Sequence, residues 1–294
     1  MSNKIMSLLC VETQKRRKPQ TLADWKAVGI NRLSIGIQTF KGEVLAALNR
    51  AHNAEQAAQC VPLARAAGFN NISIDLMYAL PGISPEDWQR DLQTALALKP
   101  EHLSAYALTI EPDTAFGRWQ QKGKLVAPPD AVAEQHYWQL IEATQQAGYE
   151  HYEVSNWALP GHYSRHNTNY WRGVAYLGLG PGAHSYNGKV REYNIRNNNQ
   201  YIAALAENRL PAERETLSRT DHINEYLMTG LRTQWGISLE KLKTDWQYDL
   251  QQAEEKYIEQ MLKEGQAALE GNRLVLTEKG RLLADEITAR LFIV

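Results

Sequence analysis

Residues 71–110, NISIDLMYALPGISPEDWQRDLQTALALKPEHLSAYALTI, contain two β-rich segments separated by one amphipathic segment. Ser84 followed by Pro85 is a strong start for a helix, because serine caps the first turn and proline fits the first helical position. One apolar helical face is then formed by Trp88, Leu92, Ala95 and Leu96. A strand, a helix and a second strand at this spacing indicate parallel strands of one sheet.

The same alternation extends toward the amino terminus. Two more strands are expected at MSLLCVE (6–12) and RLSIGI (32–37), with helices at 22–28, from 43 onward and at 54–67. Asn53 is the expected cap of the helix at 54–67 and Gly68 its stop, while Pro62 should kink that helix or remove a hydrogen bond. The first part of the chain therefore has the pattern of an α/β fold with a parallel sheet.

The rest of the chain has a mixed α+β pattern. A helix is expected at 131–147, followed by a strand at 149–155. Helices at 221–231, 239–245 and 250–263, a hairpin turning at 271–272 and a last helix capped by Thr277 suggest a winged-helix-like end. We therefore expect three domains, at 1–127, 128–216 and 217–294.

Composition limits the classes of function. The 294 residues are 44% hydrophobic and 22% charged, which is typical of a folded globular protein and excludes disorder. A net charge of -1 argues against a nucleic-acid partner, and the basic run at 15–18 is expected to be a solvated loop. No stretch of 18 apolar residues is present, so we expect no membrane insertion. The two distant cysteines fit a reducing compartment, and we expect a cytoplasmic location.

The segment RHNTNYWRGVAYLGLGPGAHSY at 165–186 carries a family resemblance. It resembles the carboxy-terminal half of HemW-type proteins, heme-chaperone relatives of oxygen-independent coproporphyrinogen III oxidase in the radical S-adenosylmethionine (SAM) superfamily. The segments RLSIGIQTF and YALPG are also similar to that family, so the resemblance runs from about residue 20 to the end. It implies a partial radical-SAM (β/α) barrel, heme as ligand and heme-acceptor proteins as partners.

The motif HNTNYW at 166–171 resembles the HN-x-x-YW motif that the family associates with heme. The resemblance implies His166 as ligand of the heme iron, with Tyr170 and Trp171 against the porphyrin. Arg165 and Arg172 are candidates for pairing with the heme propionates. The alternative is that His166 is a hydrogen-bonded core histidine and that the arginines only stack on aromatic rings.

Further histidines surround this motif. GLGPGAHS at 178–185 is interpreted as a tight turn, and His184 as a weaker ligand candidate than His166. His151 and His162 complete the group, whose spacing fits no standard zinc pattern.

SAM contacts are implied by the resemblance in the barrel part. Gln38, Arg50 and Asp75 match SAM-binding positions of the family, and Glu12 is a further match that the neighbouring QKRRKP sequence weakens. The Gln38 amide and the Asp75 carboxylate would bind the nucleoside of SAM. The Arg50 guanidinium would bind its methionine carboxylate. The alternative is that Arg50 is an ordinary loop charge and Asp75 a satisfied strand-end carboxylate.

The family's [4Fe-4S] cluster needs a Cys-x3-Cys-x2-Cys loop, whereas the cysteines here are Cys10 and Cys60. We therefore expect a heme-binding chaperone and no catalysis. Two alternatives stay open: a radical-SAM coproporphyrinogen III oxidase, which would need the cluster, or an inactive remnant truncated at the amino terminus. Two strand–helix units of a six-stranded half-barrel would then lie before residue 1 or be missing. The sequence does not fix the oligomeric state, and a dimer is one of the options.

Overall fold

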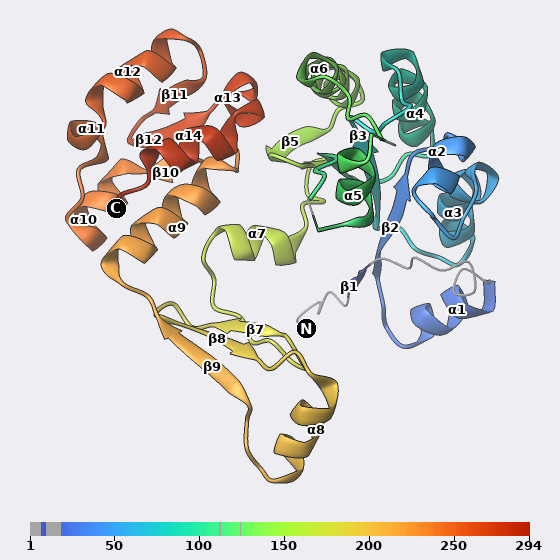
Figure 1. Cartoon of the computed structure of the whole chain (residues 1–294), viewed down its shortest axis with the longest axis horizontal. Helices are drawn as coiled ribbons and strands as arrows, with labels where there is room; N and C mark the ends of the chain where they lie inside the picture. Colours follow the sequence, from blue (N-terminus) through green and yellow to red (C-terminus); the bar gives the residue numbers. More distant parts are fainter. Residues whose placement is uncertain (1–6, 10–18, 112, 124) are drawn as a thin grey trace. The chain divides into compact units, whose positions relative to one another are not determined.

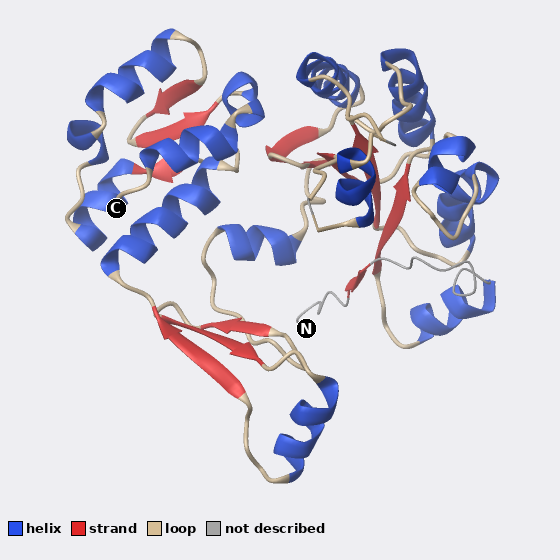
Figure 2. Cartoon of the chain, viewed as in Figure 1, coloured by secondary structure: helices blue, strands red, loops and turns tan. Residues whose placement is uncertain are grey.

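The computed structural model describes residues 7–9, 19–111, 113–123 and 125–294. The chain divides into two compact units, Met1–Tyr163 and Ser164–Val294. Figures 1 and 2 show a sheet with helices in the amino-terminal unit and two smaller sheets with helices in the carboxy-terminal unit. Each unit is described separately below.

The amino-terminal unit is built on one six-stranded sheet with the order β1-β2-β3-β4-β6-β5. Its strands are β1 (Ser7–Leu9), β2 (Arg32–Gln38), β3 (Ile72–Tyr78), β4 (His102–Ala107), β5 (Glu150–Glu153) and β6 (Asn156–Ala158). The first four are parallel, as the strand–helix alternation predicts, whereas β6 is antiparallel to both β4 and β5. The α/β class is confirmed, with a hairpin added to the parallel sheet.

The helices of this unit follow the expected pattern. They are α1 (Pro19–Ala27), α2 (Gly42–Ala47), α3 (Ala54–Ala66), α4 (Pro85–Ala97), α5 (Ala115–Gln121) and α6 (Asp130–Gln146). Capping boxes begin α3 at Asn53 and α4 at Ser84, and α3 runs through Pro62. The expected caps are therefore confirmed.

One face of the sheet is apolar and packs under helices. Leu33, Ile35 and Ile37 of β2 alternate with polar residues and are buried, and Ile74 and Leu103 occupy the matching positions on β3 and β4. Such alternation gives the sheet one apolar face and one face with polar residues.

The division between the units differs from the boundary expected after residue 127. Helix α6 packs on α4, and the β5–β6 hairpin is hydrogen-bonded to β4, so both elements belong to the amino-terminal unit. Tyr152 and Trp157 of this hairpin are among its fully buried side chains. The hairpin was expected as a single strand leading out of the barrel, and its pairing with β4 moves the division to Tyr163.

The carboxy-terminal unit begins with α7 (Arg165–Trp171) and a three-stranded antiparallel sheet in the order β7-β8-β9. The elements of this part are β7 (His184–Tyr186), β8 (Val190–Asn194), α8 (Asn198–Ala206) and β9 (Ala212–Thr216). Both β7 and β9 pair with β8, which is therefore the central strand of this sheet.

The last part of the chain has the winged-helix order of elements. These are α9 (Arg219–Leu231), β10 (Ile237–Ser238), α10 (Leu239–Trp246), α11 (Leu250–Ala253), α12 (Glu255–Lys263), β11 (Ala267–Glu270), β12 (Arg273–Leu276), α13 (Glu278–Leu282) and α14 (Ala284–Leu291). The hairpin turns at Gly271 and Asn272 as expected, and Thr277 caps α13. The expected helices at 250–263 and after Thr277 are each divided into two.

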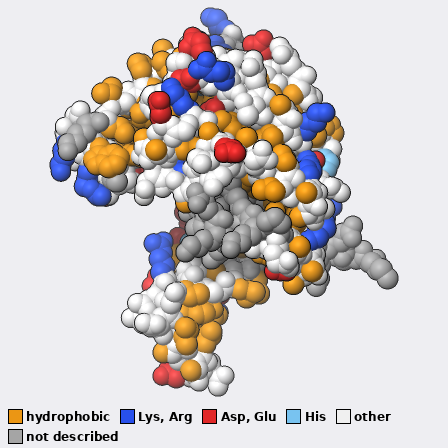
Figure 3. All heavy atoms as spheres, turned by 90° about the vertical axis from the view of Figure 1, so that its right-hand side faces the viewer, with side chains coloured by type: hydrophobic (Ala, Val, Ile, Leu, Met, Phe, Trp, Pro, Cys, Tyr) orange, Lys and Arg blue, Asp and Glu red, His pale blue; other side chains and the backbone are white. Residues whose placement is uncertain are grey.

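The surface shows no field of one sign on the face drawn in Figure 3, where acidic and basic side chains are interspersed with hydrophobic ones. None of the helices in the described part of the chain combines the length and apolarity that a bilayer crossing requires.

Candidate functional site

The face of the six-stranded sheet opposite its apolar face carries a row of polar residues. The register aligns Gly36 of β2 with Asp75 of β3, Asp75 with Ser104 of β4, and Ser104 with Asn156 of β6. Because directly paired residues point to the same side of a sheet, these positions form one row across four strands. The row lies on the face opposite the apolar residues that pack under the helices.

Hydrogen bonds connect the row. The Ser34 hydroxyl donates to Asp75 Oδ1 at 3.1 Å, and the Ser104 hydroxyl donates to Asn156 Oδ1 at 2.8 Å. The Asn156 amide in turn donates to the buried Glu153 carboxylate, which also accepts from the Ser155 amide at 3.1 Å. A set of fixed acceptors and donors on one face of the sheet is suited to bind a polar ligand.

Asp75 is the central carboxylate of this row. Burial raises the pKa of Asp75, while the hydrogen bond from Ser34 and the charges of Arg32 and Arg50 act in the opposite direction. The carboxyl group is therefore easier to protonate in the folded protein than in the unfolded chain. A ligand that donates hydrogen bonds to Asp75 would favour the ionised form.

The raised pKa of Asp75 predicts a pH dependence of stability. The pKa of Asp75 is higher in the folded protein than in the unfolded chain, where it is about 3.9. Such a group stabilises the fold at pH values below the unfolded pKa, and this contribution is lost as pH rises through the folded pKa. The difference in unfolding free energy between the wild type and Asp75→Asn should therefore fall as pH rises above about 4. Urea unfolding of both proteins at several pH values measures it, and a difference that rises with pH would contradict the assignment.

Gln38 ends β2 beside this row. Its backbone has φ of 72°, in the left-handed region, and the register with β3 shifts between Gly36 and Gln38. The side chain is buried, and its Oε1 accepts a hydrogen bond from the Tyr106 hydroxyl at 3.1 Å. The amide is therefore held at the carboxyl end of the parallel strands, where ligands of such sheets bind.

The turn after Gln38 is fixed by a buried carboxylate from α4. Asp91 accepts from the Thr39 hydroxyl at 2.5 Å and from the Phe40 amide at 2.9 Å, and Thr39 Oγ1 accepts from the Lys41 amide at 3.0 Å. Burial raises the pKa of Asp91. Asp91 therefore holds the backbone that follows Gln38 in place.

The structure brings the three described SAM candidates into one unit. Gln38 and Asp75 lie on neighbouring strands, and Arg50, after α2, is close enough for its charge to influence the Asp75 carboxyl. The fourth candidate, Glu12, lies outside the described residues.

The heme candidates lie on α7 of the other unit. Ser164 caps this helix by accepting from the Asn167 amide. His166 is exposed, so the alternative of a core histidine is wrong, and Tyr170 is 42% exposed. His166 and Tyr170 are four residues apart and therefore neighbours on one helical face.

A cavity of about 460 Å³ in the carboxy-terminal unit brings together part of the motif with later elements. Tyr170, Trp171 and Arg172 line it, whereas His166 and Arg165 are not among its lining residues. The Tyr170 and Trp171 rings pack edge to face with centroids 5.0 Å apart. The Arg172 guanidinium lies over the Trp235 ring at 4.3 Å, so this arginine does stack on an aromatic ring.

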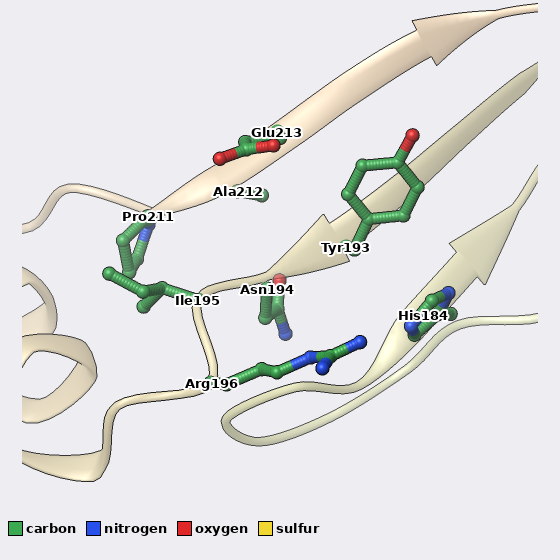
Figure 4. A pocket seen from close by; sticks show the side chains of 8 residues that line it. All are labelled: His184, Tyr193, Asn194, Ile195, Arg196, Pro211, Ala212 and Glu213. Atoms are coloured by element: carbon green, nitrogen blue, oxygen red, sulfur yellow. The ribbon is translucent and has the colours of Figure 1, made fainter. Parts of the chain in front are cut away.

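The GLGPGAHS segment is a tight turn folded against β7. A Cβ at Gly178 would lie 2.1 Å from the His184 carbonyl oxygen, so only glycine fits there. His184 is exposed and lines a second pocket with Tyr193 and Arg196, where Figure 4 shows the Arg196 side chain extending in the direction of His184. The pocket is therefore separate from the cavity beside Tyr170.

The other two histidines of the group belong to the amino-terminal unit. The His151 ring stacks on Trp157 at 4.2 Å, and the His162 carbonyl accepts from Arg32 at 3.5 Å. Within the described residues, no group of three or more His, Cys, Asp or Glu side chains could hold a metal ion.

Comparison with known proteins identifies the family. The radical SAM superfamily model matches residues 5–95, and the HemN C-terminal domain model matches residues 217–283. The heme chaperone HemW of Mycobacterium tuberculosis is 38% identical over 275 residues, which cover 93% of this chain and 68% of that protein. The chain belongs to the HemW heme-chaperone family. The resemblance found in the HNTNYW and RLSIGIQTF segments is therefore confirmed.

Other HemW relatives agree with this placement. HemW of Bacillus subtilis is 34% identical over 89% of this chain and 69% of its own length, and HemW of Escherichia coli is 42% identical over 57% of this chain and 42% of its own length. The Escherichia coli coproporphyrinogen III oxidase HemN, a radical SAM enzyme, has a similar fold, with a TM-score of 0.80, 24% identity and coverage of 98% of this chain and 69% of that one. The HemW family and the HemN fold thus share this architecture.

Sequence reasoning missed several residues of both sites. On the sheet, Ser34, Ser104 and Asn156 were not singled out, although polar residues at every second position of RLSIGIQ and HLSAYA signal a polar face. In the cavity, Arg191, Tyr226 and Lys241 come from three elements distant in sequence. No local pattern in the sequence could have grouped them.

Proposed function

We propose that this chain binds heme through His166 and passes it to heme-acceptor proteins. The observation that supports the proposal is the position of an exposed imidazole one helical turn before Tyr170, a residue that lines an aromatic cavity. Neutral imidazole is a common axial ligand of heme iron. His166 has no hydrogen-bond partner among the described residues, so its ring nitrogens are available.

Membership of the HemW family supports this role. The relatives at 34% and 38% identity are named heme chaperones, and the chain covers about two thirds of their length. A chaperone must release its cargo, and an exposed ligand on a seven-residue helix suits release better than a buried one. A respiratory enzyme that contains heme is an acceptor of the proposed kind.

A hemin titration followed by the Soret band tests the proposal. Saturable binding with a shifted Soret band is expected for the wild type, together with loss or displacement of that band in His166→Ala. His184→Ala serves as the matched control, because His184 is also exposed but lines the other pocket. Identical spectra for the wild type and His166→Ala would refute ligation by His166, and loss of the band only in His184→Ala would transfer the ligand role to that residue.

We also propose the polar row around Asp75 as the place where SAM would bind. The Asp75 carboxylate can accept hydrogen bonds from ribose hydroxyls, the buried Gln38 amide is held at the strand end, and Arg50 supplies a cation for the methionine carboxylate. The donor set is therefore suited to a nucleoside with an amino-acid group. Calorimetric titration of SAM into the wild type and Asp75→Ala checks this, and equal affinity would refute it.

The residues present do not fit the [4Fe-4S] cluster of the superfamily. A cluster loop needs three thiolates close together, and the chain has two cysteines, at positions 10 and 60. Cys60 is buried in α3, where its thiol donates to the Ala57 carbonyl at 3.0 Å. No step of radical chemistry is therefore assigned to the residues of this chain, and we do not propose the coproporphyrinogen oxidase reaction for it.

A further inference from the structure

The cavity beside Tyr170 has aromatic walls that come from four parts of the carboxy-terminal unit. Its volume of about 460 Å³ is within the usual range of small-molecule sites. Helix α7, β7 with the turn before it, α9 and α10 contribute the rings of Tyr170, Trp171, Tyr176, Tyr186, Tyr226 and Trp246. An aromatic lining of this extent indicates a ligand with a flat aromatic surface.

The rings form two connected runs. Ring centroids of Tyr170 and Tyr176 are 6.1 Å apart, and those of Tyr176 and Tyr186 are 6.2 Å apart. On the side formed by α9 and α10, the Tyr226 and Trp246 centroids are 5.4 Å apart. Burial raises the pKa values of Tyr176 and Tyr186, so both rings are neutral at physiological pH. The walls therefore contribute π surfaces without adding negative charge.

The cavity is lined by more positively than negatively charged side chains. Two of its cations are paired within it, Arg191 with Glu225 and Lys241 with Asp245. The other two, Arg172 and Lys189, have no ion pair with any residue that the structure describes. The lining thus has four cations against two carboxylates, which leaves an excess of two positive charges.

We infer that this cavity binds a flat aromatic dianion, with Arg172 and Lys189 as the partners of its two carboxylates. The inference rests on the proposed function, in which the dianion is a tetrapyrrole dicarboxylate. The cavity would bind the ring and its two carboxylates, and His166, one helical turn before Tyr170 on α7, would ligate the iron at the centre of the same ring.

Metal-free protoporphyrin IX separates these two contributions, because it has the ring and both carboxylates but no iron for His166. Its affinity for the full chain is measured by fluorescence. Arg172→Ala combined with Lys189→Ala should weaken binding about tenfold or more, as expected for two lost charge-assisted contacts. His166→Ala should leave the affinity unchanged within about twofold, which is near measurement error.

Two controls match this comparison. Arg209→Ala with Lys256→Ala removes the same charge from exposed positions of the same unit outside the cavity and should bind like the wild type. Protoporphyrin IX dimethyl ester keeps the ring but lacks the carboxylates, and in the same dilute detergent it should bind the wild type about tenfold more weakly than the diacid. The ester comparison needs no variant, so it holds even if the cavity variant folds poorly.

Equal affinity of the wild type for diacid and ester, or an equal loss in the cavity and control variants, would overturn the inference. These outcomes are distinct from a failure of the proposed function. If the hemin Soret band does not depend on His166 while protoporphyrin binding depends on Arg172 and Lys189, the cavity assignment stands and the iron-ligand assignment falls. If protoporphyrin does not bind saturably at all, the cavity assignment falls whatever His166 does.

Discussion

Replacement of Trp88 by alanine is expected to lower the unfolding free energy of the amino-terminal unit by about 4 kcal/mol. Trp88 is fully buried on α4, and its indole N–H donates to the His136 carbonyl at 2.8 Å. Its ring also packs against Tyr78 of β3, with centroids 5.9 Å apart. The substitution would leave a large cavity between two helices and the sheet and would remove the hydrogen bond to the His136 carbonyl. Urea unfolding followed by far-UV circular dichroism measures the loss.

Two further variants identify the cause. Trp88→Phe keeps an aromatic ring but loses the hydrogen bond to His136, so a smaller loss of about 1–2 kcal/mol is expected. Trp119→Ala removes a tryptophan that is 44% exposed and should change stability by less than about 1 kcal/mol. A loss below about 1.5 kcal/mol for Trp88→Ala would mean that the junction of α4 and α6 is not packed as described.

Asp91→Ala is expected to destabilise the same unit by about 3 kcal/mol, since it removes the acceptor of two hydrogen bonds in the turn after Gln38. The Thr39 hydroxyl and the Phe40 amide would then lack their partner in a mostly buried turn. Part of the loss is offset because a buried carboxylate, whose pKa is raised by burial, is also removed. Chemical unfolding near neutral pH provides the measurement.

A double-mutant cycle assigns the effect to the turn. If Asp91 acts mainly through Thr39, the combined Asp91→Ala and Thr39→Val variant should lose less stability than the sum of the two single variants, by about 1 kcal/mol or more. Glu86→Ala, at an exposed position of the same helix, serves as the control and should be nearly neutral. Strict additivity of the two changes would contradict the role given to Asp91.

Local signals in the sequence were sufficient for most elements of the fold. The capping residues Asn53 and Ser84 act within one helical turn, so their effect can be predicted from neighbouring residues. The hairpin of β5 and β6 depends on pairing with β4, which lies more than 40 residues earlier. Such non-local pairing leaves little trace in the local pattern, and the boundary at residue 127 was consequently placed too early.

The candidate sites show the same contrast. The HNTNYW motif pointed to α7, and the motif RLSIGIQ pointed to Gln38, because each is contiguous in sequence. The polar row across β2, β3, β4 and β6 and the cavity with Lys189 and Lys241 are assembled by tertiary structure from separate elements. The ion pairs of Arg191 and Lys241, which also depend on tertiary structure, were needed to show which cations of the cavity lack an ion-pair partner.

The kinetics of heme transfer from the hemin-loaded chain to an excess of an apo b-type cytochrome would decide whether this protein is a carrier. We expect the transfer rate to increase with acceptor concentration, because a carrier delivers heme in a complex with its acceptor. His166→Ala, which keeps the cavity but lacks the iron ligand, should begin from a loaded state with a lost or displaced Soret band. A rate that is independent of acceptor concentration and equal to spontaneous heme dissociation would instead show a protein that binds heme without delivering it.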